Sequence, residues 1–214
     1  MSNSIEPSAK NPFFDSRKSP TRFRDIDVKL HAKVAIDSHI KSLADDFEKF
    51  ESRLSLNTEI AYDFKDIFDY LEQIQNPLNR TWGQISHLAG VNDSKEVREI
   101  KNEYLAKIID IGNKIGQSAP LYSILDEIKT SSNGEKRVVE QTKRSMEKSG
   151  IGLESEQQKD FNEIKARLAK LKANFSENLM DATKSFKHVV TDYETLKECP
   201  DYVLEMWNPE SPKE

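Results

Sequence analysis

The chain has 214 residues, of which 36% are apolar and 32% are charged, and its formal net charge is −5. The apolar share is below the roughly 45–50% of a typical globular domain. It therefore argues against a large compact globule and fits an elongated helical structure. Acidic and basic residues are mixed along every segment, so no basic face is expected for nucleic acid. No stretch has the roughly 18 to 20 apolar residues of a membrane span.

Residues 1–26 are predicted to form an irregular N-terminal arm. Three prolines interrupt regular structure there. Phe13, Phe14 and Phe23 give the arm apolar surface to bury, so it is expected to pack against the rest of the chain.

The next two long segments are predicted to be helices. The first covers residues 28–56, where apolar side chains recur three and four positions apart: Leu30, Val34, Ile40, Leu43, Phe47, Phe50 and Leu54. Thr58 is the expected N-cap of the second helix. Pro77 lacks an amide donor and is expected to break or kink that helix, which ends near Gly90.

Three further helices are expected in the middle of the chain. Ser94 is the predicted start of one that ends at Gly116, and Ser118 with Pro120 starts a shorter one. Residues 131–134 (SSNG) are expected to be a loop. A helix over residues 135–148 should then close at Gly150.

The last long helix has the clearest predicted start, because Ser155 and Gln158 have the spacing of a capping box. Its apolar residues run three and four apart from Phe161 to Leu179, and the helix is expected to reach Phe186. Val189-Val190 is a candidate for a short extended piece. The same apolar residues would also allow coiled-coil pairing with another chain. The predicted fold is all-α, an elongated antiparallel multi-helix array. Its parts are an arm (1–26), a helical domain (27–206) and a polar tail (207–214).

The sequence offers no recognisable catalytic, cofactor-binding or metal-binding residues. The four histidines are His31, His39, His87 and His188, and none begins an H-E-x-x-H pattern. That pattern places two imidazoles on one helical turn beside a single zinc ion. Each histidine is therefore expected to be a surface or packing residue.

Three other features are interpreted as structural. Gly150-Ile151-Gly152 lacks the third glycine of a phosphate loop and is expected to be a helix end with a turn. Trp82 beside Gly83 is expected to lie in the core, where the glycine would let a neighbouring helix approach. Cys199, the single cysteine, has no evident activating partner and is not expected to be a nucleophile.

Five segments together resemble a known family. They are residues 11–15 (NPFFD), 23–26 (FRDI), 80–88 (RTWGQISHL), 92–98 (NDSKEVR) and 171–183 (LKANFSENLMDAT). In this order they resemble the N-terminal helical domain of oligopeptidase A and thimet oligopeptidase, a family of zinc metallopeptidases.

One departure lies just before the last long helix. There the family has an aromatic residue, Ser-Gly and then Leu-Pro. Ser149 and Gly150 are present here, but no proline follows.

The resemblance implies a non-catalytic domain that shapes the substrate channel for short peptides. Zinc and the chemistry would belong to a catalytic half outside this chain, acting in cis or in trans. This hypothesis predicts an exposed apolar helix face for that half. The alternative is a free-standing helical protein–protein interaction module. The absence of a secretory signal and the acidic Glu6 and Asp15 favour the cytoplasm, with mitochondria as the alternative.

Overall fold

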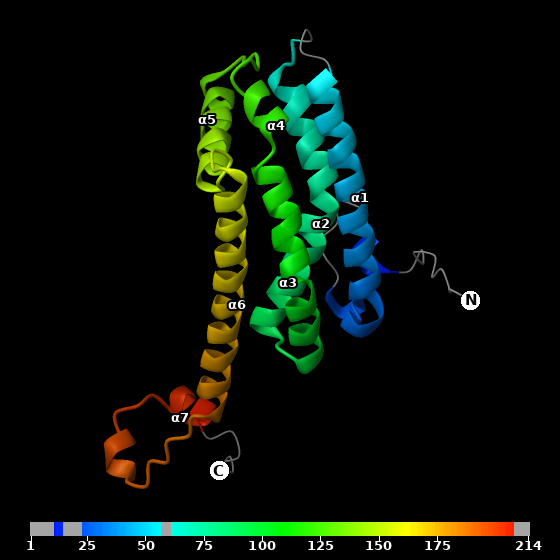
Figure 1. Ribbon diagram of the computed structural model, residues 1–214. Helices are drawn as coiled ribbons and strands as arrows, with labels where there is room; N and C mark the ends of the chain where they lie inside the picture. The colour runs from blue at the N-terminus through cyan, green and yellow to red at the C-terminus, as the bar shows by residue number, and fades with distance from the viewer. Residues whose placement is uncertain (1–10, 15–22, 57–60, 208–214) are drawn as a thin grey trace, which may run out of the picture. The chain divides into compact units, whose positions relative to one another are not determined.

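The computed structural model describes residues 11–14, 23–56 and 61–207. These residues form an all-α structure, which confirms the predicted fold class (Figure 1). The α-helices in the described ranges are α1 (Val28–Leu56), α2 (Phe64–Val91), α3 (Lys95–Gly116), α4 (Ala119–Ile124), α5 (Asn133–Lys148), α6 (Ser155–Ser185) and α7 (Asp201–Trp207). None of these helices combines the length and apolarity needed to cross a bilayer.

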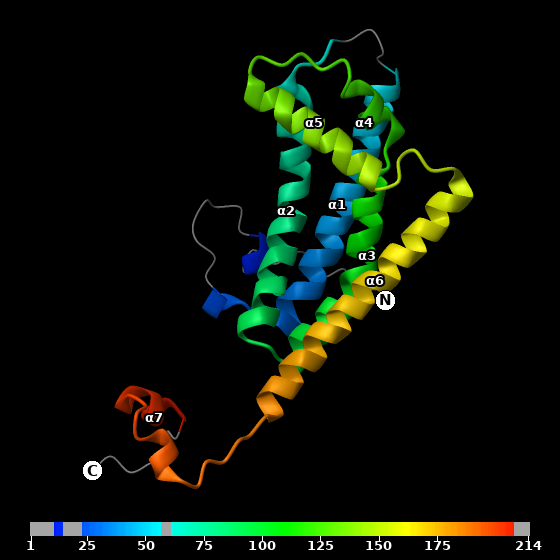
Figure 2. The same cartoon turned by 90° about the vertical axis from the view of Figure 1, so that its left-hand side faces the viewer.

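The chain divides into two compact units, Met1–Ala173 and Asn174–Glu214. In the first unit, α1, α2 and α3 lie beside one another and run up, down and up (Figures 1 and 2). Helix α5 crosses the end of this bundle near α4 (Figure 2). Each helix therefore turns one face toward its neighbours, which is how an antiparallel bundle buries its apolar side chains.

The apolar interior of the first unit consists of two main clusters. One lies toward α4 and α5 and includes Phe47, Phe50 and Leu121, each at most 2% exposed. The other lies along α1, α2 and α3 and includes Ile36 and Tyr104, at 0% and 1% exposed. Together they give the three long helices a continuous buried seam.

Helix α1 has the predicted bounds, but its buried face differs at the start. Leu43, Phe47, Phe50 and Leu54 are buried as predicted, whereas Leu30 is 67% exposed. Near the N-terminal end of α1 the buried residues are Ala32, Ala35, Ile36 and His39. Small side chains at this end let α2 and α3 approach, so the face turned inward is not the one with the largest side chains.

Helix α2 departs from the predictions in two ways. The predicted cap Thr58 lies outside the described residues, and the observed N-cap is Asp63. The Asp63 carboxylate accepts from the Asp66 N–H at 3.0 Å, and the Asp66 carboxylate accepts from the Asp63 N–H at 2.9 Å. A break or a kink was expected at Pro77, and the break does not occur, since α2 continues through it. Burial of Leu78 and its neighbours in the core outweighs the roughly 3 kcal/mol that an interior proline costs.

The caps of the shorter helices follow the sequence signals with one correction. Ser94 and Ser118 cap α3 and α4 as predicted, each accepting a backbone N–H at 3.3 Å. Residues 131–134 are not all loop, because α5 begins at Asn133. The Ser132 hydroxyl accepts from the Glu135 N–H at 3.2 Å. This cap stabilises a helix start two residues earlier than expected.

The described part of the N-terminal arm packs onto the bundle, as predicted. The segment Pro12–Phe14 forms a short 3-10 turn in which Phe13 is 5% exposed. The Asn11 side chain donates to the His31 carbonyl oxygen at 3.0 Å. Phe23 is less buried, at 38% exposed, and contacts the His87 ring.

The turn between α5 and α6 is set by Gly150, which ends α5 as predicted. Its φ of 88° is the left-handed conformation that favours glycine. The Gly150 N–H donates to the Glu147 carbonyl at 3.0 Å, and the Ile151 N–H donates to the Met146 carbonyl at 3.2 Å. These two bonds form the Schellman arrangement that closes a helix.

The second unit contains the end of α6, a 3-10 turn (Tyr193–Leu196) and α7. Helix α6 ends at Ser185, close to the predicted Phe186. Val189 and Val190 lie in an irregular stretch and do not form the expected extended piece. Of the predicted polar tail (207–214), Trp207 is the last residue of α7, and residues 208–214 lie outside the described residues.

Candidate docking surface

The most distinctive surface of the chain is the exposed apolar side of α6. Ile164, Leu168 and Leu171 are 67%, 49% and 55% exposed, and the spacing continues with Phe175 and Leu179 at 68% and 58%. At 100° per residue these five side chains fall within one sector of the helix. No residue of α6 is fully buried. We call Ile164, Leu168 and Leu171, which lie in the first unit, the α6 stripe.

A different side of α6 faces α3, and its residues are polar or small. Asn162 of α6 exchanges two hydrogen bonds, of 2.8 and 3.1 Å, with Gln117, which lies just after α3. Lys165 donates to the Asn113 side-chain oxygen at 2.7 Å. The half-buried Ala166 and Ala169 lie on this side too. The body therefore holds α6 by hydrogen bonds and alanines, and the larger apolar residues remain outside.

Helix α6 begins differently from its predicted capping box. Ser155 is the first helical residue, and the Glu154 carbonyl accepts the first helical bond from Gln158 at 2.8 Å. The Gln158 side chain donates to the Gly150 carbonyl at 3.0 Å. It therefore ties the start of α6 to the end of α5 and does not cap α6 itself.

Charged residues border the α6 stripe on both sides. On a helix of 3.6 residues per turn, Arg167 and Lys172 fall on opposite edges of the stripe, and Asp160 falls on the same edge as Arg167. All three side chains are exposed. The stripe is thus an apolar surface with a mainly basic border, an arrangement typical of interaction surfaces with an apolar centre and a polar rim.

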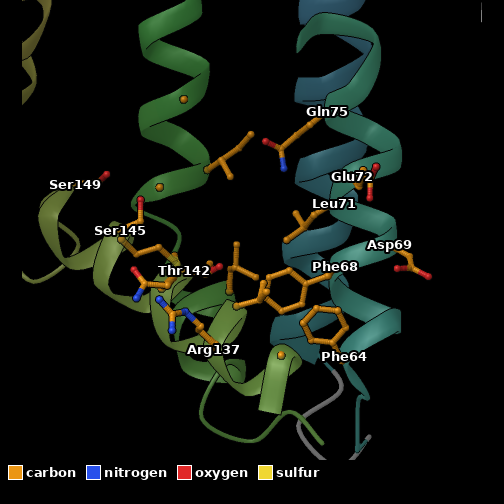
Figure 3. A pocket seen from close by; sticks show the side chains of 18 residues that line it. Phe64, Phe68, Asp69, Leu71, Glu72, Gln75, Arg137, Thr142, Ser145 and Ser149 are labelled. Atoms are coloured by element: carbon orange, nitrogen blue, oxygen red, sulfur yellow. The ribbon is translucent and has the colours of Figure 1, made fainter. Parts of the chain in front are cut away.

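A groove of about 850 Å³ lies between α2 and α5 in the first unit (Figure 3). Phe64 and Phe68 of α2 form one wall, and their rings are stacked with the ring centroids 4.4 Å apart. Arg137 of α5 lies on the opposite wall. Gly112 of α3 is part of the lining, and a Cβ atom there would meet nothing within 4 Å. The groove is therefore open above α3.

The groove has no evident catalytic set. Its hydroxyl groups belong to Thr142, Ser145 and Ser149, and no histidine or cysteine is among its lining residues. Asp69 and Glu72 line its α2 side.

The structure places the four histidines in different surroundings. His31 accepts the Asp27 N–H at its Nδ1, 3.0 Å away. His39 is buried, lies 3.0 Å from the Thr81 hydroxyl and packs edge-on against Phe14. His87, on α2, lies against the ring of Phe23, and His188 lies in the second unit. Across the described part of the chain, no three His, Cys, Asp or Glu residues are grouped as metal ligands.

The remaining sequence candidates have structural surroundings. Trp82 packs against the core cluster along α1–α3, as expected. Gly83 does not admit a neighbouring helix, because a Cβ atom there would meet nothing within 4 Å. Cys199 is a half-buried free thiol in the second unit. The polar contacts of Gln117 and Asn162 were missed from the sequence, since 45 positions separate the two residues.

Comparison with known proteins gives a consistent result. Residues 36–158 match the family model of the neurolysin/thimet oligopeptidase N-terminal domain. The chain is 29% identical over 202 residues to "Probable cytosolic oligopeptidase A" of Arabidopsis thaliana, covering 92% of this chain and 28% of that protein.

Two further relatives bear similar names. "Organellar oligopeptidase A, chloroplastic/mitochondrial" of the same plant is 28% identical over 94% of this chain and 25% of its own length. "Oligopeptidase A" of Haemophilus influenzae is 33% identical over 63% of this chain and 21% of its own length. The chain thus spans about a quarter of the length of these relatives.

The family match covers more than half of the 214 residues and includes parts of α1 to α6. It agrees with the all-α fold and with the segments of resemblance that lie within its bounds. The chain therefore belongs to the neurolysin/thimet oligopeptidase family, and its matched part is the family's N-terminal domain.

Proposed function

We propose that this chain is a non-catalytic helical domain that docks through the α6 stripe onto the catalytic half of an oligopeptidase A-like zinc metalloendopeptidase. The docked domain forms one wall of a channel that admits short, unstructured peptides. Zinc and the reacting groups belong to the catalytic half, which acts in the same polypeptide or as a separate chain.

The observation that carries this proposal is the exposure of the α6 stripe. Leu168 and Leu171 remain about half exposed although the rest of the first unit has well-buried clusters. Soluble proteins seldom leave a contiguous apolar surface uncovered unless it binds something. About three quarters of each curated relative lies outside the region matched here, so the relatives contain the additional protein that such a surface would need.

The charged residues along the edges of the stripe indicate which charges the partner surface should have. Arg167 and Lys172 border it on opposite sides. We expect the catalytic half to present an apolar strip bordered by carboxylates, because complementary charges at the rim speed association and fix its register. Ionic strength should therefore slow association more than it weakens the final apolar contact.

The direct experiment is reconstitution. The test protein is the Arabidopsis cytosolic oligopeptidase A without the region that this chain matches. We expect the two proteins to form a one-to-one complex by calorimetry. We also expect added chain to increase cleavage of a short fluorogenic peptide in the presence of zinc.

A matched pair of variants identifies the surface. Leu168→Ser with Leu171→Ser should abolish complex formation, because it removes apolar area from the centre of the interface. Glu163→Ser with Lys170→Ser, at exposed positions off the stripe, should leave binding unchanged. Equal binding by both variants, or no complex with the unaltered chain, would contradict the proposal.

The alternative is a helical interaction module that serves a different partner. The clusters around Phe47 and Ile36 favour it, since they give the first unit a core of its own. That module would bind its partner and leave peptide cleavage unchanged in the reconstitution.

For location we propose the cytosol, with mitochondria as the alternative, and fractionation of cells that make the tagged chain distinguishes them.

A further inference from the structure

On hydrophobicity alone, α6 would be expected to turn its apolar residues toward α3 and its polar residues toward solvent. The structure has the reverse arrangement. The side turned to α3 has Asn162, Lys165 and Ala169, while Leu168 and Leu171 face away from it. Apolar burial is the main favourable term in helix packing and has no preferred direction. A rotation of α6 about its own axis would bury the stripe against the body, so some directional interaction must oppose that rotation.

The directional interactions come from two polar residues at the end of α3. Gln117 donates to the Asn162 side-chain oxygen at 2.8 Å and to the Ser149 carbonyl at 2.7 Å, and it accepts from Asn162 at 3.1 Å. One glutamine therefore links α3, the α5–α6 turn and α6. Because both amides act as donor and acceptor, a rotated helix would break both bonds together.

The second contact makes rotation more costly. Asn113 is only 5% exposed, and its side-chain oxygen accepts from the Lys165 ammonium at 2.7 Å. A leucine brought to this place by rotation of α6 would leave the Asn113 oxygen without that donor. Buried polar groups without partners are strongly disfavoured, and a bond to a charged donor is stronger than one between neutral groups.

We infer that Asn113, Gln117, Asn162 and Lys165 are positioning residues that hold the α6 stripe outward, away from the body of the chain. We call them the polar grip. The grip selects one of two faces of α6, in the way that a single buried polar pair selects one register in a coiled coil. Its use in docking rests on the function proposed above, but the orientation itself is a property of the free chain.

Thiol labelling of the free chain tests the orientation. In a Cys199→Ser background, a cysteine is placed either at Leu168 on the stripe or at Ala169 on the side that faces α3. A bulky maleimide should modify Leu168→Cys several-fold faster than Ala169→Cys. Gln117→Leu with Asn162→Leu should bring the two rates close together, because the helix then has no polar reason to keep its stripe outside.

Two controls separate orientation from general damage. The exchanged pair Gln117→Asn with Asn162→Gln keeps one amide on each helix and should restore most of the rate difference. Gln73→Leu with Asn79→Leu, at exposed positions on α2, should leave the difference intact. If the leucine pair loses helix content by circular dichroism, Asn162→Ala is read in the same way, since it removes the bonds without adding apolar bulk.

The outcomes are distinct from those of the reconstitution. A rate difference that survives removal of the polar grip, with helix content unchanged, overturns this inference and leaves docking by the stripe untouched. Failure to bind the catalytic half, with the labelling result as expected, overturns the proposed function and leaves the orientation standing. An exchanged pair that behaves like the leucine pair would also contradict the grip.

Discussion

Helices α1 and α6 are of similar length, 29 and 31 residues, and both have apolar residues at helical spacing. In α1 most of these apolar residues are buried, with Phe47 and Phe50 at 0% and 2% exposed. In α6 they are exposed, with Leu168 and Phe175 at 49% and 68%. Periodicity therefore predicts that a helix has an apolar face, but whether this chain itself covers that face depends on the polar contacts of its other faces.

The largest expected difference between the two helices is in stability. Phe47→Ala should lower the free energy of unfolding by about 3–5 kcal/mol, because it removes a fully buried ring and leaves a cavity. Leu168→Ala should change it by no more than about 0.5 kcal/mol, as for other surface positions. Urea unfolding followed by circular dichroism measures both. A cost above about 2 kcal/mol at Leu168 would mean that the stripe is already buried in solution.

A pair of glycine substitutions compares the turn that precedes α6 with the interior of α3. Gly150→Ala should destabilise the chain by about 1–2 kcal/mol, because alanine resists the left-handed conformation. Its Cβ would also lie 3.0 Å from Leu153. Gly112→Ala should stabilise it by about 0.5–1 kcal/mol, since α3 has open space there. Thermal melts of the two variants should therefore shift in opposite directions, and shifts of the same sign would contradict the geometry of the α5–α6 turn.

A smaller effect is expected from acid at His39, on the buried side of α1. Burial lowers the pKa of His39 below its usual value of 6.5. Between the two pKa values the unfolded chain binds more protons than the folded chain, so stability is at its full value above about pH 6.5 and falls as the pH is lowered. His39→Gln should weaken this dependence between pH 7 and 5. Identical pH profiles for the variant and the unaltered chain would show that His39 does not contribute.

The sequence predicted most helices because their signals are local. The bounds of α1 and the caps Ser94 and Ser118 depend on residues within one or two turns. The unbroken helix at Pro77 and the exposure of Leu30 have another cause, since packing against other helices decides whether a proline is tolerated and which face is buried. Tertiary contacts of this kind override local propensity.

The candidate docking surface was predictable only in part. The apolar spacing of α6 is evident in the sequence, and the family resemblance explains why a partner is expected. The polar grip was not predictable, because Gln117 and Asn162 come together from 45 positions apart, and Lys165 and Asn113 from 52. Gln158 shows the same limitation, since its bond to Gly150 took the place of the predicted capping box.

The measurement closest to the central claim is hydroxyl-radical footprinting of side chains, with and without the catalytic half of the Arabidopsis relative. The account predicts that Ile164, Leu168 and Leu171 are oxidised readily in the free chain and become protected in the complex. Phe47 should be protected in both states. Protection of the α6 residues in the free chain, or unchanged oxidation when the catalytic half is bound, would contradict the claim that α6 presents its apolar side to a partner.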